Sequence, residues 1–456
     1  MSEALEREHW PTLLGATNNH LQLLINCFVL CHKHETLLLN SENDPRLYNL
    51  NRELRENPPA NFDAAFFTAP EDKEALVRIA ACLFSLSIKW RESISRLVTE
   101  ATFPLTPHPS FDARIFTVSP IFSLISQTAP RLPRHDDELT PTLAEYHPGI
   151  RFTPAFQGDI ELMHCPIGLE TGTSEGFRQL RESSKLRIGI SPLSATAKLR
   201  GTAELGYPPD RKSRFHITSL QNEDQELAAL EAILQDCRKQ DVHILVLPEL
   251  RVSPAMLEVI RLFLDTQESS GVKTGRGLLL VAAGSWHFND ETAFRNNCTV
   301  FDAYGRRLWT HTKLTAYQAT EDNVAKAPAA FAEFGIERNG GVEHINRGTQ
   351  LEFTDTAIGR ITVAICVGFC HSRPFDAIRA AAPDIVLVPS MTSSMDMLHD
   401  KANELVRFHA STFVANCGVM GKGKNGSFYR LPLPNATNTL IDSGNNLLIM
   451  DLQTLQ

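Results

Sequence analysis

Cys366 has the sequence surroundings best suited to nucleophilic chemistry. A run of strand-forming residues from Ile361 to Ile365 leads into it, Gly368 loosens the backbone just beyond, and Pro374 suits the first turn of a helix. A cysteine between a strand end and a helix N-terminus can have its thiolate favoured by the helix dipole. The alternative is that Cys366 is a small buried hydrophobic residue, which is the usual role of a lone cysteine.

Two further titratable residues also stand just past predicted strands. Glu249 ends the segment Leu-Val-Leu-Pro-Glu, and Lys313 ends Trp-Thr-His-Thr-Lys. Taken alone, Glu249 reads as an N-cap or a surface carboxylate, and Lys313 as a solvated loop residue. Open α/β sheets build their sites where strands end, so the joint placement of these residues with Cys366 favours one shared site.

From about residue 185 to 456 the chain resembles the nitrilase, or carbon–nitrogen hydrolase, superfamily. The resemblance is carried by the ordered Glu, Lys and Cys segments, and by the Gly305-Arg306 hairpin ahead of the lysine. Pro389-Ser390 and the segment Ala-Asn-Cys-Gly at 415–418 also match. The family implies an α/β fold, a four-layer α-β-β-α sandwich, which assembles as a homodimer or higher homo-oligomer and needs no cofactor.

The resemblance also implies a function. Members are thiol hydrolases of non-peptide carbon–nitrogen bonds, and we expect a small amide substrate in preference to a nitrile. Cys366 would form a thioester and Glu249 would act as general base. Lys313 would stabilise the oxyanion together with a backbone N–H just after the cysteine.

Further site residues are expected close to the triad in sequence. Family members often carry a second glutamate soon after the lysine, and Glu321 is the best local candidate. The residues expected to line the substrate pocket are Tyr317, Phe369, His371, Ser390 and Met391.

Gly368 is the main departure from the family, whose members usually carry an acidic residue two positions after the nucleophile. The second interpretation is therefore a catalytically impaired nitrilase-like scaffold or sensor, for example in a bacterial defence system, with the N-terminal region as its interaction module. The intact triad favours an enzyme. Asp136-Asp137 lacks the surroundings of a polymerase palm strand, so no polymerase is indicated.

The chain of 456 residues is longer than one hydrophobic core usually organises, and its residue patterning suggests three parts. Residues 1–110 have the apolar spacing of helices, including a capping box of Thr68 and Glu71 before a long helix. Residues 111–184 are rich in proline and predict an irregular linker or subdomain. Residues 185–456 alternate strands with helices, which indicates the α/β catalytic domain.

Composition excludes several other classes of protein. The net charge of -9 makes a nucleic-acid partner unlikely, since phosphate binding needs concentrated Lys and Arg. No apolar run is long enough to span a membrane, and the acidic N-terminus is unlike a signal peptide, so we expect a cytoplasmic protein. The nine cysteines are then reduced thiols.

Zinc is the alternative use of the cysteines. The side chains of Cys366, Cys370 and His371 could bind zinc, but the sequence shows no second group of ligands to complete such a site. Cys31 and His32 are better explained as residues at the C-terminus of a helix. We therefore predict no metal site.

Overall fold

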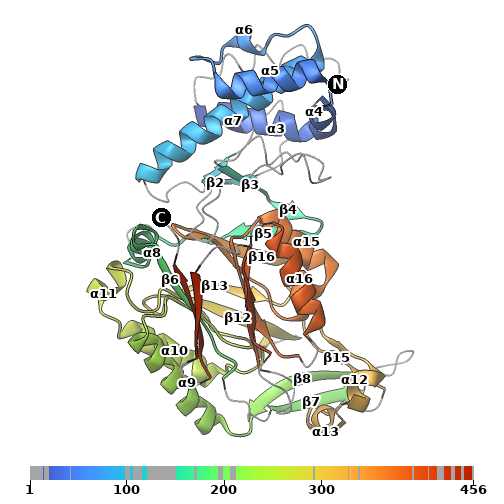
Figure 1. Ribbon diagram of the computed structural model, residues 1–456. Coiled ribbons are helices and arrows are strands. Elements are labelled where there is room, and N and C mark those ends of the chain that lie inside the picture. The colour runs from blue at the N-terminus through green and yellow to red at the C-terminus, as the bar shows by residue number, and fades with distance from the viewer. Residues whose placement is uncertain are drawn as a thin grey trace. The chain divides into compact units, whose positions relative to one another are not determined.

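The computed structural model of the protein forms two compact units, Met1–Ile121 with Thr128–Ala155, and Phe122–Gln127 with Phe156–Gln456 (Figure 1). No helix among the residues described below is both long and apolar enough to cross a membrane. The structure describes residues 14, 20–41, 43–97, 103–105, 116–120, 150–168, 172–193, 199–205, 212–290, 293–326, 328–336, 339–392, 395–408, 410–417, 426–432, 437–442 and 446–453.

The first unit is mainly helical. The apolar faces of its helices meet in one core, in which Leu24, Phe28, Ile79 and Leu83 are buried. The predicted capping box is not formed: Thr68 closes α6 by donating its hydroxyl hydrogen to Ala64 O, and α7 starts only at Asp72. The elements of this unit are α3 (His20–Lys33), α4 (Glu35–Ser41), α5 (Pro45–Glu56), α6 (Ala64–Phe67), α7 (Asp72–Leu97), and the antiparallel strands β1 (Phe103–Leu105), β2 (Phe116–Pro120) and β3 (Ile150–Pro154).

The second unit contains two large sheets. One has eight strands: β11 (Trp286–Asp290), β12 (Ala293–Asp302), β10 (Leu280–Ala282), β9 (Ile244–Val246), β6 (Lys185–Ile190), β22 (Leu448–Gln453) and β21 (Thr437–Asp442) in this order, with β13 (Arg307–Thr312) paired to β12. The other has seven, ordered β20 (Phe428–Arg430), β19 (Ser411–Asn416), β18 (Ile385–Ser390), β17 (Gly359–Val363), β16 (Gln350–Thr356), β5 (Ile160–His164) and β4 (Phe156–Gln157).

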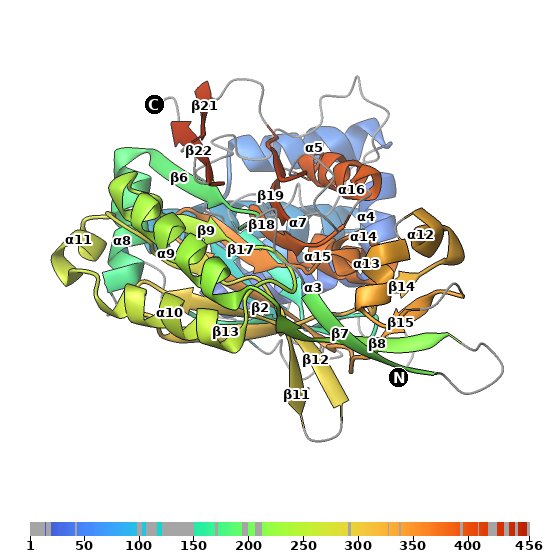
Figure 2. The same cartoon turned by 90° about the horizontal axis from the view of Figure 1, so that it is seen from below.

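These sheets pack face to face between two layers of helices (Figure 2). Ile188 and Val246 of one sheet share a core with Ile361 and Leu387 of the other. Strands β9, β18 and β19 are buried on both faces, and each has an apolar stretch that predicts this: 244–246, 385–388 and 413–415. Helices α9 (Glu223–Lys239) and α10 (Pro254–Asp265) cover the outer face of the eight-stranded sheet, and α15 (Ser372–Ala381) and α16 (Asp396–Val406) cover the seven-stranded one. The predicted α-β-β-α sandwich is confirmed.

A third sheet of four strands was not anticipated from the sequence, which reads as a long loop after Lys313. Its order is β14 (Gln318–Ala319), β15 (Gly341–Glu343), β8 (Ser213–Leu220) and β7 (Leu199–Leu205), and β15 runs parallel to β8. The short helices α12 (Glu321–Lys326) and α13 (Pro328–Glu333) connect β14 to β15.

The start of the second unit corrects the boundary expected at residue 185. Strand β5 pairs in parallel with β16, and α8 (Gly172–Ser183) also belongs to this unit. The reason is that Ile160 and Leu162 of β5 are buried in the second unit, a contact that local proline content does not reveal. Asp136-Asp137 lies outside the described residues.

Candidate active site

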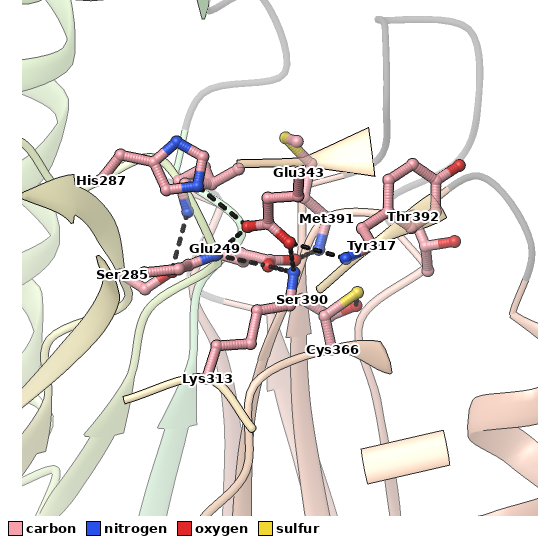
Figure 3. A network of polar contacts seen from close by, with 12 residues as sticks. Glu249, Ser285, His287, Lys313, Tyr317, Glu343, Cys366, Ser390, Met391 and Thr392 are labelled. Atoms are coloured by element: carbon pink, nitrogen blue, oxygen red, sulfur yellow. Dashed lines mark hydrogen bonds and ion pairs between the residues drawn. The ribbon is translucent and has the colours of Figure 1, made fainter. Parts of the chain in front are cut away.

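The three strand-end residues converge at one buried site (Figure 3). Glu249 follows β9, Lys313 follows β13 and Cys366 follows β17, so the two large sheets both contribute. Their exposed fractions are 2%, 1% and 7%. Packing the carboxyl ends of these strands against one another therefore brings together residues that are far apart in the sequence.

Lys313 lies between two carboxylates. Its Nζ is 2.7 Å from Glu249 Oε1 and 2.7 Å from Glu343 Oε2. Burial alone would favour the neutral amine, but Glu249 and then Glu343 outweigh it and raise the pKa of Lys313. For Glu343, burial is opposed by Lys313 and His287, which together lower its pKa. The site thus holds a permanent ammonium ion at neutral pH.

Glu249 is fixed by donors from three directions. Its Oε1 accepts hydrogen bonds from Lys313 Nζ and from Asn296 Nδ2, the latter at 3.0 Å. Its Oε2 accepts one from the Met391 N–H at 3.2 Å. Leu250, the next residue, has a φ of 55°, a backbone conformation rare for residues other than glycine. The carboxylate is therefore held in one orientation.

Glu343 is held as firmly. Its Oε1 accepts from Asn296 Nδ2 at 2.8 Å and lies 2.9 Å from His287 Nε2, and its Oε2 also accepts the Tyr317 N–H at 2.8 Å. His287 Nδ1 accepts the Ile217 N–H at 2.7 Å, so the hydrogen-bond pattern assigns the proton to Nε2. His287 is thus a neutral donor to Glu343.

Glu343 also corrects the expectation for Glu321. Glu321 is exposed at the start of α12 and has no contact with Lys313. The second carboxylate, Glu343, lies on β15, and it reaches the site because β15 pairs with β8. The long segment between Lys313 and β15 separates the two residues in sequence but not in space. Spacing along the chain could not have shown this.

Cys366 occupies a sharp turn. Its φ is 45° and its ψ is -113°, and its N–H donates to Pro389 O at 2.9 Å. Burial, and next the charge of Glu249, raise the pKa of the thiol, although Lys313, the Ser390 hydroxyl and the Met391 N–H act in the opposite direction. The expected activation by a helix dipole is not found, because α14 (Val367–Cys370) has only four residues. The resting cysteine is therefore a thiol that needs a base.

The five residues expected in the pocket divide into two groups. Tyr317, Ser390 and Met391 lie at the site, and burial together with the nearby Cys366 raises the pKa of Tyr317 to about 12. Phe369 does not lie at the site. Its ring packs against that of Phe375 in the helical layer over the seven-stranded sheet, with 5.9 Å between the ring centroids. His371 is exposed between α14 and α15. The turn at Cys366 directs the chain away from the site, so neighbours in sequence are not neighbours in space.

Asn296 and His287 are site residues that the sequence reasoning missed. Each is buried and bonded to Glu343. Both are polar residues within runs of strand-forming residues, where asparagine in particular is rare, and this could have marked them as candidates.

Gly368 is not required by sterics. A Cβ atom there would meet only Leu314 N, 3.9 Å away. The backbone at this position would therefore have accommodated a Cβ atom. Among the described residues no group of three or more His, Cys, Asp or Glu is arranged to hold a metal ion.

Comparison with known proteins finds similarity at the level of structure. No family model matches the sequence, and no curated protein matches it. An amidase from Nesterenkonia sp. is similar over 59% of this chain and 90% of its own, with 17% identity and a TM-score of 0.36. Saccharomyces cerevisiae Nit3, a member of branch 10 of the nitrilase superfamily, is similar over 59% of this chain and 90% of its own, with 14% identity and a TM-score of 0.35.

Proposed function

We propose that the second unit is a carbon–nitrogen hydrolase that cleaves a small linear amide through a thioester on Cys366. The observation that carries this proposal is the buried ammonium of Lys313, held by Glu249 and Glu343 beside a cysteine at a strand end. A buried cation with two carboxylate partners is a costly arrangement, and such groups concentrate at functional sites. The proposal includes assembly as a homodimer or higher homo-oligomer.

In the first half of the reaction, Glu249 takes the thiol proton and the sulfur attacks the amide carbon. The negative charge that develops on the amide oxygen is stabilised by Lys313 and by the backbone N–H just after Cys366. Glu249 then returns the proton to the leaving nitrogen, the carbon–nitrogen bond breaks and an acyl thioester remains.

In the second half, Glu249 takes a proton from water, which attacks the thioester carbon. The carbon–sulfur bond breaks, the sulfur regains a proton, and the carboxylic acid leaves. A fixed cation suits the oxygen anion of an amide, so we favour an amide over a nitrile as substrate.

The test is detection of the acyl-enzyme. Full-length protein incubated with acetamide, propionamide, butyramide and the matching nitriles should gain the mass of an acyl group and release ammonia with at least one of them. Cys366→Ala is the control and should do neither. A wild-type chain that gives no adduct and no ammonia with any of these compounds, while remaining folded by circular dichroism, would contradict the proposal for short-chain substrates.

A further inference from the structure

Three consecutive residues at the end of β18 contact both the nucleophile and the base. Pro389 O accepts the Cys366 N–H at 2.9 Å, and Ser390 Oγ lies 3.4 Å from Cys366 Sγ. Ser390 O accepts the Glu249 N–H at 3.4 Å, and the Met391 N–H donates to Glu249 Oε2 at 3.2 Å. One short segment therefore sets the distance between the sulfur and the carboxylate.

The Ser390 hydroxyl is fully buried and points at the sulfur. A hydroxyl can donate to a thiol only weakly, but the same bond becomes charge-assisted when the sulfur is a thiolate. The hydroxyl itself has 0% exposure, so water does not compete for its hydrogen bond to the sulfur.

The Met391 N–H is the second donor. In the resting site it donates to the Glu249 carboxylate at 3.2 Å, and as a donor beside the sulfur it also lowers the pKa of Cys366. It therefore faces two acceptors whose charges change in opposite directions when the proton moves.

We propose that the Ser390 hydroxyl and the Met391 N–H form a donor pair for the Cys366 thiolate, with Ser390 as the side chain on which the thiolate depends. When the S–H bond breaks, the electron pair stays on sulfur and the proton joins Glu249. The carboxyl is then neutral and a weaker acceptor, while the sulfur is a stronger one, so the Met391 N–H shifts from oxygen to sulfur. Ser390 holds its bond to sulfur throughout. This role deepens the proposed function and rests on it.

Alkylation of Cys366 by 2-iodoethanol, a neutral reagent with no carbon–nitrogen bond, tests the donor pair without an amide substrate. The full chain is treated across a pH series, and the rate at Cys366 is followed by peptide mass mapping. Ser390→Ala should slow alkylation at neutral pH about tenfold and move its pH profile to higher pH, as loss of one charge-assisted hydrogen bond predicts. Ser390→Thr keeps the hydroxyl and should restore most of the rate.

Ser191→Ala is the matched control. Ser191 is also a fully buried serine at the end of a strand, but its hydroxyl accepts the Leu193 N–H and does not contact Cys366. Its profile should equal that of the wild type. An unchanged profile in Ser390→Ala, or a Ser390→Thr variant as slow as Ser390→Ala, would overturn the proposal. Failure of the amide screen with a shifted alkylation profile would instead count against the proposed function alone.

Discussion

Lys313 shows how charge balance is achieved at single residues. The ammonium is almost inaccessible to water, so each carboxylate that faces it replaces hydration that the fold has removed. His287 adds a hydrogen bond to Glu343 without adding charge, because its Nδ1 is occupied by the Ile217 N–H. Removing a single partner would leave a buried charge incompletely compensated.

Glu343→Gln should reduce kcat/KM for amide hydrolysis at least 100-fold, about 3 kcal/mol of transition-state stabilisation. The amide removes the charge that holds Lys313, and its NH2 group cannot accept from Lys313 or Tyr317. Ammonia release gives kcat and KM, and circular dichroism checks folding. Glu321→Gln is the matched control and should match the wild type, since Glu321 is exposed. A loss of activity in Glu321→Gln with an active Glu343→Gln would reverse this assignment.

At the site, the sequence predicts those residues that are marked by a local pattern. Glu249, Lys313 and Cys366 each follow a recognisable strand, so their convergence follows from the rule that strand ends share an edge. Glu343 could not be found in this way, because its position depends on the pairing of β15 with β8. Phe369 was assigned to the pocket because it is close in sequence, but the turn at Cys366 turns it into the helical layer.

At the scale of elements, the four-stranded sheet determines whether Glu343 reaches the site. Strand β15 enters it through Gly340, which has a φ of 85°. A Cβ atom on Gly340 would collide with the carbonyl oxygen of Ala319 in β14. The register of β15, and with it the position of Glu343, therefore depends on a residue without a side chain at this turn.

Gly340→Ala should lower the free energy of unfolding by about 2 kcal/mol, because it combines positive φ with a backbone collision. It should also lower amide hydrolysis by displacing β15. Urea denaturation and ammonia release measure the two effects. Gly271→Ala is the control: its Cβ would meet only Arg276 Cβ, 4.0 Å away, and alanine suits the helix α11 (Ser269–Lys273), so stability should not fall and activity should stay the same. Equal behaviour of the two variants would show that the turn tolerates a side chain.

At the scale of the whole molecule, buried histidines link stability to pH. Burial, and then Arg187, lower the pKa of His243 to about 3, and burial lowers that of His164 to about 4 despite Asp355. Both folded-state values lie below the ordinary value near 6.5. Between these limits the unfolded chain binds more protons than the folded one, so stability falls as the pH decreases.

We expect the free energy of unfolding to decrease as the pH is lowered from 7 to 4, with His243 responsible for about 3 kcal/mol of the loss. His243→Asn should flatten this dependence. The asparagine can still accept the Arg187 N–H that His243 Nδ1 accepts, but it does not titrate. Urea denaturation at a series of pH values provides the measurement. His371→Asn, at an exposed position, should leave the slope as it is. A His243→Asn slope equal to that of the wild type would assign the acid sensitivity to other groups.

The architecture of the second unit was easier to predict from the sequence than the residue at which the unit begins. Alternating strands and helices after Lys185 predicted the sandwich, because each apolar run can be buried only between layers. The boundary near 185 was placed too late, since β5 belongs to the second unit through its pairing with β16. Such pairing between distant segments is set by tertiary contacts, which local composition does not contain.

The backbone at the site carries a cost in stability. Cys366 and Leu250 both have positive φ, which glycine would adopt with less strain, by about 1 kcal/mol or more per residue. Selection for stability alone would favour glycine at position 366. The chain instead keeps a cysteine there, beside Glu249, where it can react. A cysteine at this position is thus at odds with the preference of the backbone, which is the pattern of a trade-off between stability and activity.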